Sequence, residues 1–419
     1  MKPAFEIAHE DAMAIKASMG MVVKDFLGRS DVATRDADAM HDGFKLVTSK
    51  TNSRMYTRRS AHPTLKECLT IGRTHDMSIE DVGYLMYSDT NDQFRTDQAI
   101  FYEHNFQDAY ILQTIHKRTE DEPYHYFGVK YKQISIPSSG LAEVRDTVFF
   151  EYMGMTQDSV GHRVFFVVRD SEYLQNVIPT PGIVRLQFRT LQIFTEVDGG
   201  TVEFVSRSFM NPNGILPAWM CNRQLVRYAS IIESLPIALQ YKRFLEKVKR
   251  QPSRRMRKNF AKTCIVCNTK MTVFNFKALY NCMYCGEIIC AKCVVPVPRA
   301  FKKGGATTVA KDDFCKRCFV EGQSFRDSRG SSEFKSSVVD MDSSSVTSST
   351  QDEVYESYLS SCNAVAKPTI FAKESSPDQV AVIPDAPIDF SQLQTSIEEQ
   401  KALVSQMQQR LEARSQYYP

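Results

Sequence analysis

The sequence lacks any run of eighteen uninterrupted apolar residues, so it predicts no helix that crosses a membrane. Its first twenty residues carry Glu6, Glu10 and Asp11 where a secretion signal has a basic and then an apolar stretch. We therefore expect a cytoplasmic protein that is at most peripheral on endosomal or other internal membranes.

Motifs of catalysis are also missing. The chain has no nucleophile elbow, P-loop or glycine-rich dinucleotide motif. The histidines of the first 250 residues lie without metal-ligand spacing, for example His62, His75, His104, His116 and His125. We interpret them as isolated polar or core residues and predict that the protein is not an enzyme.

What the sequence does have is a strongly uneven charge over its 419 residues, a length that predicts two or three domains. Residues 1–240 carry 25 basic and 30 acidic side chains, residues 241–318 carry 19 and 4, and residues 319–419 carry 8 and 15. The net charges are therefore −5, +15 and −7, and the overall +3 conceals a basic block between two acidic regions.

Helix-like and strand-like patterns alternate in the first 250 residues. A helix is predicted over residues 5–27, then a polar loop, a first strand at 65–71, and a short helix from its cap Ser78 to Tyr87. Six strands follow, at residues 109–115, 124–136, 147–155, 163–169, 184–197 and 202–210. Asp198, Gly199 and Gly200 predict a hairpin between the last two, and such short connections predict a mainly antiparallel sheet.

An amphipathic helix is predicted from Pro217 to about residue 249. Pro236 lies inside it, so we expect a kink or a break near Ile232. One antiparallel sheet and one long amphipathic helix must cover each other, which predicts an α+β fold.

The last region changes character. We expect residues 322–386, which are rich in serine and acidic residues, to be disordered. Beyond them a coiled-coil pattern begins, with Gln400 polar in a seam formed by Leu393, Ile397, Val404, Met407 and Leu411. Three heptads make a weak coil, so a lone amphipathic helix and a homodimer through this coil are equally open.

Eight of the eleven cysteines form four C-x-x-C pairs, separated by fourteen, four and twenty-one residues: Cys264 and Cys267, Cys282 and Cys285, Cys290 and Cys293, Cys315 and Cys318. Such clustering without a secretion signal favours metal over the alternative of disulfides or a metal-free cluster. The pairs supply ligands for two tetrahedral Zn²⁺ ions, and closed four-thiolate sites are structural rather than catalytic. Only four residues separate the second pair from the third, which favours an interleaved arrangement of the two sites.

This spacing resembles the FYVE zinc finger over about residues 254–323, with Cys282-Met283-Tyr284-Cys285-Gly286 and Ile289-Cys290-Ala291-Lys292-Cys293 as the best-matched segments. The resemblance implies that one Zn²⁺ is held by Cys264, Cys267, Cys290 and Cys293, and the other by Cys282, Cys285, Cys315 and Cys318.

The FYVE family reads phosphatidylinositol 3-phosphate with three basic elements, and this chain lacks all three. Arg255 and Lys258 occupy the W-x-x-D position, residues 278–283 (ALYNCM) replace R-R/K-H-H-C-R, and residues 313–315 (DFC) replace R-V-C. An aspartate where an arginine should meet a phosphate is repulsive, so we do not expect specific binding of that lipid by this route. The finger resembles the family in fold only.

Two features could still engage a membrane. Met271, Val273 and Phe274 lie where the family inserts an apolar loop, with packing onto the finger's own core as the alternative. Residues 242–262 contain ten basic residues against Glu246 alone and could bind anionic headgroups, with a solvated helix end and linker as the alternative. The basic residues nearest the finger are Arg254, Arg255, Arg257 and Lys258. Nucleic acid is not expected, since few aromatic residues, Phe244 and Phe260, interleave with the basic residues of this run.

The segment from about residue 64 to 249 resembles the START lipid-transfer domain. The resemblance lies in residues 126–130 (YFGVK), in Arg145-Asp146 before residues 148–152 (VFFEY), and in residues 214–219 (GILPAW) before the last helix. It implies a helix-grip fold, in which a curved antiparallel sheet surrounds a long C-terminal helix and a closed pocket holds one lipid beneath that helix as a lid.

Strand alternation predicts one apolar and one polar face for this sheet. Val184, Leu186 and Phe188 would face inward, while Arg185, Gln187 and Arg189 would face outward. The alternation slips between Phe188 and Leu191, which predicts a bulge. The inward set could line a cavity or pack a solid core, and no individual pocket residue is predicted.

These patterns predict four parts: residues 1–250 as a START-like lipid-binding domain, 251–323 as the FYVE-like finger with its basic approach, 324–386 as a disordered linker and 387–419 as a coiled-coil helix. The leading hypothesis is a non-enzymatic lipid-binding adaptor with two Zn²⁺ ions, whose finger engages an anionic membrane or a protein partner. The alternative is a zinc-finger interaction scaffold without lipid cargo. A RING-type ubiquitin ligase is disfavoured, since that family places a histidine where Cys282 and Cys285 lie.

Overall fold

The computed structural model describes residues 5–29, 35–137, 142–174, 177, 179–197, 200–250, 263–270, 279–303 and 306–323. These residues belong to one compact unit, Met1–Asp342, and the second unit, Ser343–Pro419, contains none of them. The predicted linker and coiled-coil helix therefore lie outside the described residues, and so do Asp198 and Gly199 of the predicted hairpin.

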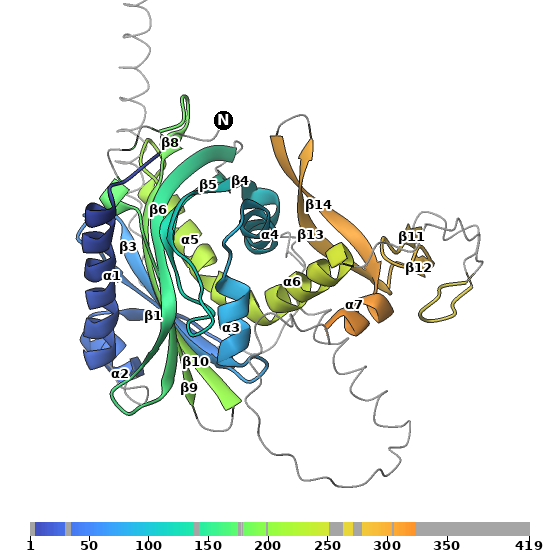
Figure 1. Cartoon of the computed structure of the whole chain (residues 1–419), viewed down its shortest axis with the longest axis horizontal. Helices are drawn as coiled ribbons and strands as arrows, with labels where there is room; N and C mark the ends of the chain where they lie inside the picture. The colour runs from blue at the N-terminus through green and yellow to red at the C-terminus, as the bar shows by residue number, and fades with distance from the viewer. Residues whose placement is uncertain are drawn as a thin grey trace, which may run out of the picture. The chain divides into compact units, whose positions relative to one another are not determined.

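A single large sheet forms the centre of the described part (Figure 1). Its strands run in the order β1-β2-β3-β10-β9-β7-β6-β5-β4, neighbours pair antiparallel, and the two-residue β8 pairs parallel with β6. The strands are β1 (Lys45–Ser49), β2 (Ser53–Arg59), β3 (Lys66–Thr74), β4 (Phe106–His116), β5 (Tyr126–Pro137), β6 (Ala142–Gln157), β7 (Arg163–Asp170), β8 (Val184–Arg185), β9 (Gln187–Val197) and β10 (Thr201–Asn211).

The predicted first strand and the six that follow are confirmed to within about five residues at each end, except that the strand predicted at 184–197 is divided into β8 and β9. The prediction of a loop before them was wrong, because β1 and β2 occupy residues 45–59. Every residue of β1 is at least partly exposed, so this edge strand has no apolar alternation to mark it in the sequence.

Helices cover the inner face of the sheet: α3 (Ile79–Met86), α4 (Asn91–Tyr102), α5 (Ala218–Ala229), the 3₁₀ turn η4 (Ser230–Ser234) and α6 (Leu235–Arg250). The predicted break near Ile232 is confirmed, because η4 separates α5 from α6 directly before Pro236. Ser78 caps α3 as expected, in a capping box with Asp81. Helix α4 was not predicted, because the polar residues on its surface obscure the pattern of its buried positions.

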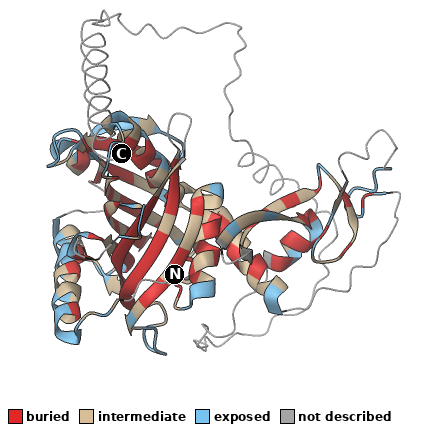
Figure 2. Ribbon diagram, turned by 90° about the horizontal axis from the view of Figure 1, so that it is seen from above, coloured by how far each residue is buried: buried red, intermediate tan, exposed pale blue. Residues whose placement is uncertain are grey.

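The outer face is covered as well, by α1 (His9–Arg29), with α2 (Arg35–His41) near β3. Met19 and Val23 of α1 belong to a cluster with Phe150, Phe166 and Ile193 of the sheet. The prediction of a polar outer face was therefore wrong, and so was that of a bulge in β9, which keeps regular register with β10. Leu191 and Ile193 are apolar because they belong to the cluster with α1, and about half of the residues in the large sheet are buried (Figure 2).

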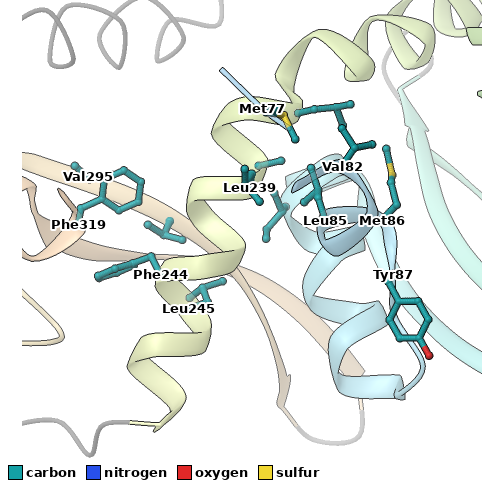
Figure 3. Packing of buried hydrophobic residues seen from close by; sticks show 14 of the residues in the cluster. Met77, Val82, Leu85, Met86, Tyr87, Leu239, Phe244, Leu245, Val295 and Phe319 are labelled. Atoms are coloured by element: carbon teal, nitrogen blue, oxygen red, sulfur yellow. The ribbon is translucent and has the colours of Figure 1, made fainter. Parts of the chain in front are cut away.

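The cysteine-rich segment forms two small sheets and a helix: β11 (Leu279–Asn281) with β12 (Ile288–Cys290), the long hairpin β13 (Val294–Lys303) and β14 (Ala306–Cys315), and α7 (Lys316–Gln323). This finger shares a hydrophobic core with α3 and α6 (Figure 3). The ring of Phe244 from α6 is fully buried, with its centroid 4.6 Å from that of Phe314 and 5.3 Å from that of Phe319.

The hairpin β13–β14 also reaches α4 and β4. Thr307 Oγ1 donates a hydrogen bond to Asp108 Oδ1 at 2.8 Å, and the Lys311 ammonium lies 2.8 Å from the Glu103 carboxylate.

The antiparallel sheet with helices packed on its inner face confirms the predicted α+β class and the helix-grip arrangement. The finger packs against the same helical layer. No helix in the described part of the chain is both long and apolar enough to cross a membrane.

Candidate functional site

A cavity of about 110 Å³ lies between the inner face of the sheet and the helices α4, α5 and η4. Its sheet wall includes Leu186 and Phe188, which were predicted to face inward. Its helical wall is mostly apolar and aromatic: Phe101, Tyr102, Leu225, Tyr228, Ala229, Ile231, Ile232 and Leu235. The interior is therefore partly hollow at this end of the domain.

The sheet wall of the cavity carries a polar band that the sequence did not predict. Ser206 and Ser208 of β10 pair with Gln192 and Thr190 of β9, and Thr190 pairs in turn with Arg169 of β7. All five residues line the cavity. Directly paired side chains in an antiparallel sheet lie on one face, so the band crosses three strands without a break.

Arg169 connects this band to a buried ion-pair network. Its Nε lies 2.6 Å from Glu151 Oε2, its Nη1 donates to Gln192 Oε1 at 2.8 Å, and the Lys130 ammonium pairs with the other oxygen of Glu151. Burial alone would raise the pKa of the Glu151 carboxyl, but the Lys130 and Arg169 cations together hold that pKa below its ordinary value. The two cations therefore share one internal counter-charge.

A further lysine of β5, Lys132, also lines the cavity and is 7% exposed. Its ammonium donates to Tyr102 Oη at 2.9 Å and lies 4.6 Å from the Tyr102 ring centroid and 4.8 Å from that of Phe188. Two hydroxyls of the cavity wall, Thr190 Oγ1 and Tyr228 Oη, are buried without a partner of normal hydrogen-bond geometry among the described residues. The cavity thus offers a cation and hydroxyl groups within aromatic walls.

The helical wall begins in an unusual turn. Asn213 and Gly214 have φ angles of 52° and 72°, in the left-handed region, and they lead into α5. Asn213 Nδ2 donates to the carbonyl of Arg185 at 2.8 Å, which ties the turn to β8. Beside this turn Ile215 is 90% exposed and Trp219 is 63% exposed, although the segment flanks the cavity wall.

At the other end of the helical layer, α6 is fixed by a buried charge. Lys242 donates to the carbonyls of Leu85 and Tyr87 at 2.9 Å each and to Asp97 Oδ2 at 3.0 Å. Burial raises the pKa of Asp97 to about 6, against the lowering effect of the Lys242 ammonium. This contact joins α6 to α3 and α4.

The eight clustered cysteines form two quartets, and in each quartet all four sulfurs lie within 4.8 Å of one another. One quartet is Cys264, Cys267, Cys290 and Cys293, and the other is Cys282, Cys285, Cys315 and Cys318. This is the interleaved grouping that the resemblance implied. The Sγ atoms of Cys267 and Cys290 are 3.7 Å apart and those of Cys285 and Cys315 4.0 Å, close to the roughly 3.8 Å edge of a tetrahedron with Zn–S bonds of about 2.3 Å. Each quartet could therefore hold one metal ion.

Tight turns shape both quartets. Asn268 and Gly286 follow their C-x-x-C pairs with φ angles of 53° and 77°, and their amides donate back to the carbonyls of Cys264 and Cys282. The amide of Cys290 also donates to the Cys264 sulfur at 3.5 Å, a hydrogen bond of the kind that orients a metal ligand. C-x-x-C spacing signals these turns in the sequence.

The predicted membrane contacts of the finger, Met271, Val273, Phe274, Arg254, Arg255, Arg257 and Lys258, lie outside the described residues. Asp313, found in place of a phosphate-binding arginine, accepts a backbone hydrogen bond from Met283 through its carbonyl at 2.9 Å. Its neighbour Phe314 is buried against Phe244. The segment that replaces R-V-C therefore packs against α6.

Two histidines that looked isolated in the sequence lie together, which corrects that interpretation. The ring centroids of His116 and His125 are 5.8 Å apart, and the Lys16 ammonium of α1 lies 2.7 Å from His116 Nδ1 and 3.3 Å from His125 Nε2. Burial and then the Lys16 charge lower the pKa of both histidines. The cluster ties α1 to β4 and the start of β5, away from the cavity.

A larger hollow, of about 470 Å³, lies on the outer face beside α1 and α2. Arg29, Asp38 and Asp42 are among its lining residues, and the chain that joins the two helices, residues 30–34, is outside the described part. Its wall is more charged than that of the inner cavity, and no predicted site residue lies there.

Neither a family model nor a curated protein sequence matches this chain. Human STARD10 is similar in structure with 14% sequence identity and a TM-score of 0.38, over 54% of this chain and 88% of that chain. Human StAR-related lipid transfer protein 5 is similar with 15% identity and a TM-score of 0.40, over 56% and 98% of the two chains. A fragment of a STAR-related lipid transfer protein from Xanthomonas axonopodis gives 20% identity and a TM-score of 0.35, over 48% and 99%. Such distant likenesses define neither the family nor the ligand of this chain.

Proposed function

We propose that this chain is a non-enzymatic lipid-binding adaptor, with a START-like domain that takes a lipid into the inner cavity. The observation that carries the proposal is the cavity itself, since it lies where a helix-grip fold closes its helices onto the sheet and its walls combine apolar and aromatic residues with a few polar groups. That composition is typical of small-molecule sites.

The cavity is too small for a complete lipid, so lipid uptake must involve a movement of its walls. At about 110 Å³ it is well below the roughly 300–1,000 Å³ of pockets that enclose drug-sized ligands. A complete lipid therefore requires the wall of α5 and η4 to move outward. The left-handed turn at Asn213 and Gly214 precedes α5, and η4 interrupts the helical layer before α6, so each supplies a point at which this wall can bend.

We propose that each cysteine quartet holds one Zn²⁺ in a structural site of FYVE-like type. The support is the donor set, four thiolates per site with sulfur separations suited to a tetrahedral ion. When bound, the metal supplies cross-links that hold the finger's turns together. Phe314 and Phe319, which flank Cys315 and Cys318, would in this way be fixed against Phe244 of α6.

The finger is the proposed adaptor element, engaging an anionic membrane or a protein partner. The support is the charge of residues 251–323, with 14 basic against 4 acidic side chains. Specific phosphatidylinositol 3-phosphate binding is not proposed, because the basic elements for it are missing. A scaffold without lipid cargo remains the alternative, in which the finger acts and the cavity stays empty.

The test is native mass spectrometry of the full chain, with lipid extraction, as purified and after exposure to mixed liposomes. We expect one lipid per chain, and a Ser208→Leu variant should lose it because the added side chain fills the cavity. Ser230→Leu adds the same volume to η4 outside the set of lining residues and should keep the lipid. A wild-type chain that stays empty after liposome exposure would support the scaffold instead.

A further inference from the structure

Three lysines of the helix-grip domain are buried, and two of them have an internal carboxylate. Lys130 pairs with Glu151, and Lys242 pairs with Asp97. Lys132 lies two residues after Lys130 on the same strand and the same face, and no carboxylate of the described residues lies within 4.0 Å of its ammonium. It is also the one of the three that lines the cavity.

The contacts of Lys132 stabilise a cation without neutralising it. Its ammonium donates to Tyr102 Oη and lies within 5.6 Å of the ring centroids of Tyr102, Phe149 and Phe188. Aromatic faces attract a cation, but they supply no opposite charge. A buried ammonium without a counter-ion is costly, and an anion that enters the cavity would remove that cost.

We propose that Lys132 is the head-group site for an amphiphile that carries a single carboxylate, which makes a fatty acid the ligand class of this cavity. The inference rests on the proposed lipid-binding function and narrows it. Thr190, Ser206, Ser208 and Tyr228 line the cavity with hydroxyl groups that can donate to the oxygens of such a head group once it is inside. The apolar remainder of the wall takes the beginning of the chain.

The donors in the cavity fit a carboxylate better than a phosphate. Phosphate groups are usually met by bidentate guanidinium groups, and the guanidinium of this cavity, Arg169, is already engaged by Glu151 and Gln192. One ammonium and neutral hydroxyls match a single negative charge on two oxygens. The charge and the hydrogen-bond donors of the site therefore favour a ligand with a single negative charge.

The experiment compares dodecanoate with dodecanol, which has the same chain and a neutral head. Binding to the delipidated full chain is measured by calorimetry for wild type, for Lys132→Met and for the control Lys66→Met, whose lysine is exposed on β3. We expect wild type and the control to prefer dodecanoate by about tenfold to a hundredfold, the range for a hydrogen bond to a charged group. Lys132→Met should bind both ligands with similar affinity.

The outcomes separate this inference from the function on which it rests. Equal binding of both ligands by wild type would overturn the carboxylate site and leave a lipid cavity. A preference that persists in Lys132→Met would also overturn it, because the anion would then bind elsewhere. If wild type binds neither ligand and also takes up no lipid from liposomes, the proposed function fails with it. The wild-type comparison decides the question even if Lys132→Met does not fold.

Discussion

The two ends of the helical layer on the inner face of the sheet are built in opposite ways. At the end of α6, the ring of Phe244 fills the space between the helix and the finger, and the Lys242 charge is paired with Asp97. At the end of α4, α5 and η4, a cavity remains, and the Lys132 charge has no carboxylate partner among the described residues. The same layer is packed at one end and open at the other.

This difference indicates that the α6 end stabilises the fold and that the cavity end binds a ligand. Tight aromatic packing and paired charges stabilise a fold, whereas voids and uncompensated charges cost stability and persist where a ligand repays that cost. We therefore expect substitutions at the finger end to change stability, and substitutions at the cavity end to change ligand binding with little loss of stability.

Loss of a metal site should have the largest effect. Cys315→Ser removes a buried ligand of the second quartet, and structural Zn²⁺ contributes about 10 kcal/mol or more to folding in isolated fingers. We expect metal content to fall from two ions to one and the thermal midpoint to drop strongly, as measured by elemental analysis and circular dichroism. Cys221→Ser, outside both quartets, should keep two ions; two ions in Cys315→Ser would contradict the assignment.

Removal of the aromatic contact between α6 and the finger should have the next largest effect. Phe244→Ala deletes a fully buried ring and should cost about 3–5 kcal/mol in the free energy of unfolding. Phe301→Ala, at a partly exposed position of β13, should cost less than about 1 kcal/mol. Denaturant titration measures both, and equal costs would mean that the finger is not part of the domain core.

The two neighbouring lysines of β5 provide a matched pair. Lys130→Met leaves Glu151 paired with Arg169 but removes the buried hydrogen bonds of Lys130 to Glu151 and Ser88, so it should cost about 1–3 kcal/mol. Lys132→Met removes a charge that has no counter-ion, so its stability should stay within about 1 kcal/mol of wild type. A large cost for Lys132→Met in denaturant titration would show that this charge is compensated within the protein.

The smallest expected effect concerns pH and lies on the outer face. Because the folded-state pKa values of His116 and His125 are lowered, their contribution to stability is complete above the unfolded value of 6.5 and is lost as the pH falls through that value towards the lower folded values. The charged and polar groups around them are Lys16, His9, Glu122 and Tyr152.

A double variant, His116→Gln with His125→Gln, should lose less stability than wild type between about pH 7.5 and pH 5. Asp97 and Asp170, with pKa values raised to about 6, titrate in the opposite sense, so the comparison uses the difference between the two pH profiles of the denaturation midpoint. Parallel profiles would show that the histidines do not titrate with folding.

The sequence predicted the regular elements and the two cysteine quartets well, because their signals are local. The strand pattern, the Ser78 cap, the break before Pro236 and the four cysteine pairs each depend on residues close together in the chain. The prediction failed where a residue packs against a segment that is distant in the sequence. Leu191 is apolar because it packs against α1, which lies far from it along the chain.

The candidate site was missed for the same reason. Lys132 and Arg169 resemble ordinary outward-facing charges in a strand, and only the paired register of five strands shows that they face the interior. The contact of Phe244 with Phe314 joins two segments that the domain division separated at residue 250. No local sequence pattern indicates such a contact.

The most direct test of the contrast between the two ends is photo-crosslinking of the full chain with a fatty acid that carries a photoreactive group along its chain. Peptide mapping should place the crosslinks in α4, in β9 and in α5 with η4, around the cavity. Crosslinks confined to α6 and the finger would contradict the account, since they would place the ligand at the end that we assign to stability.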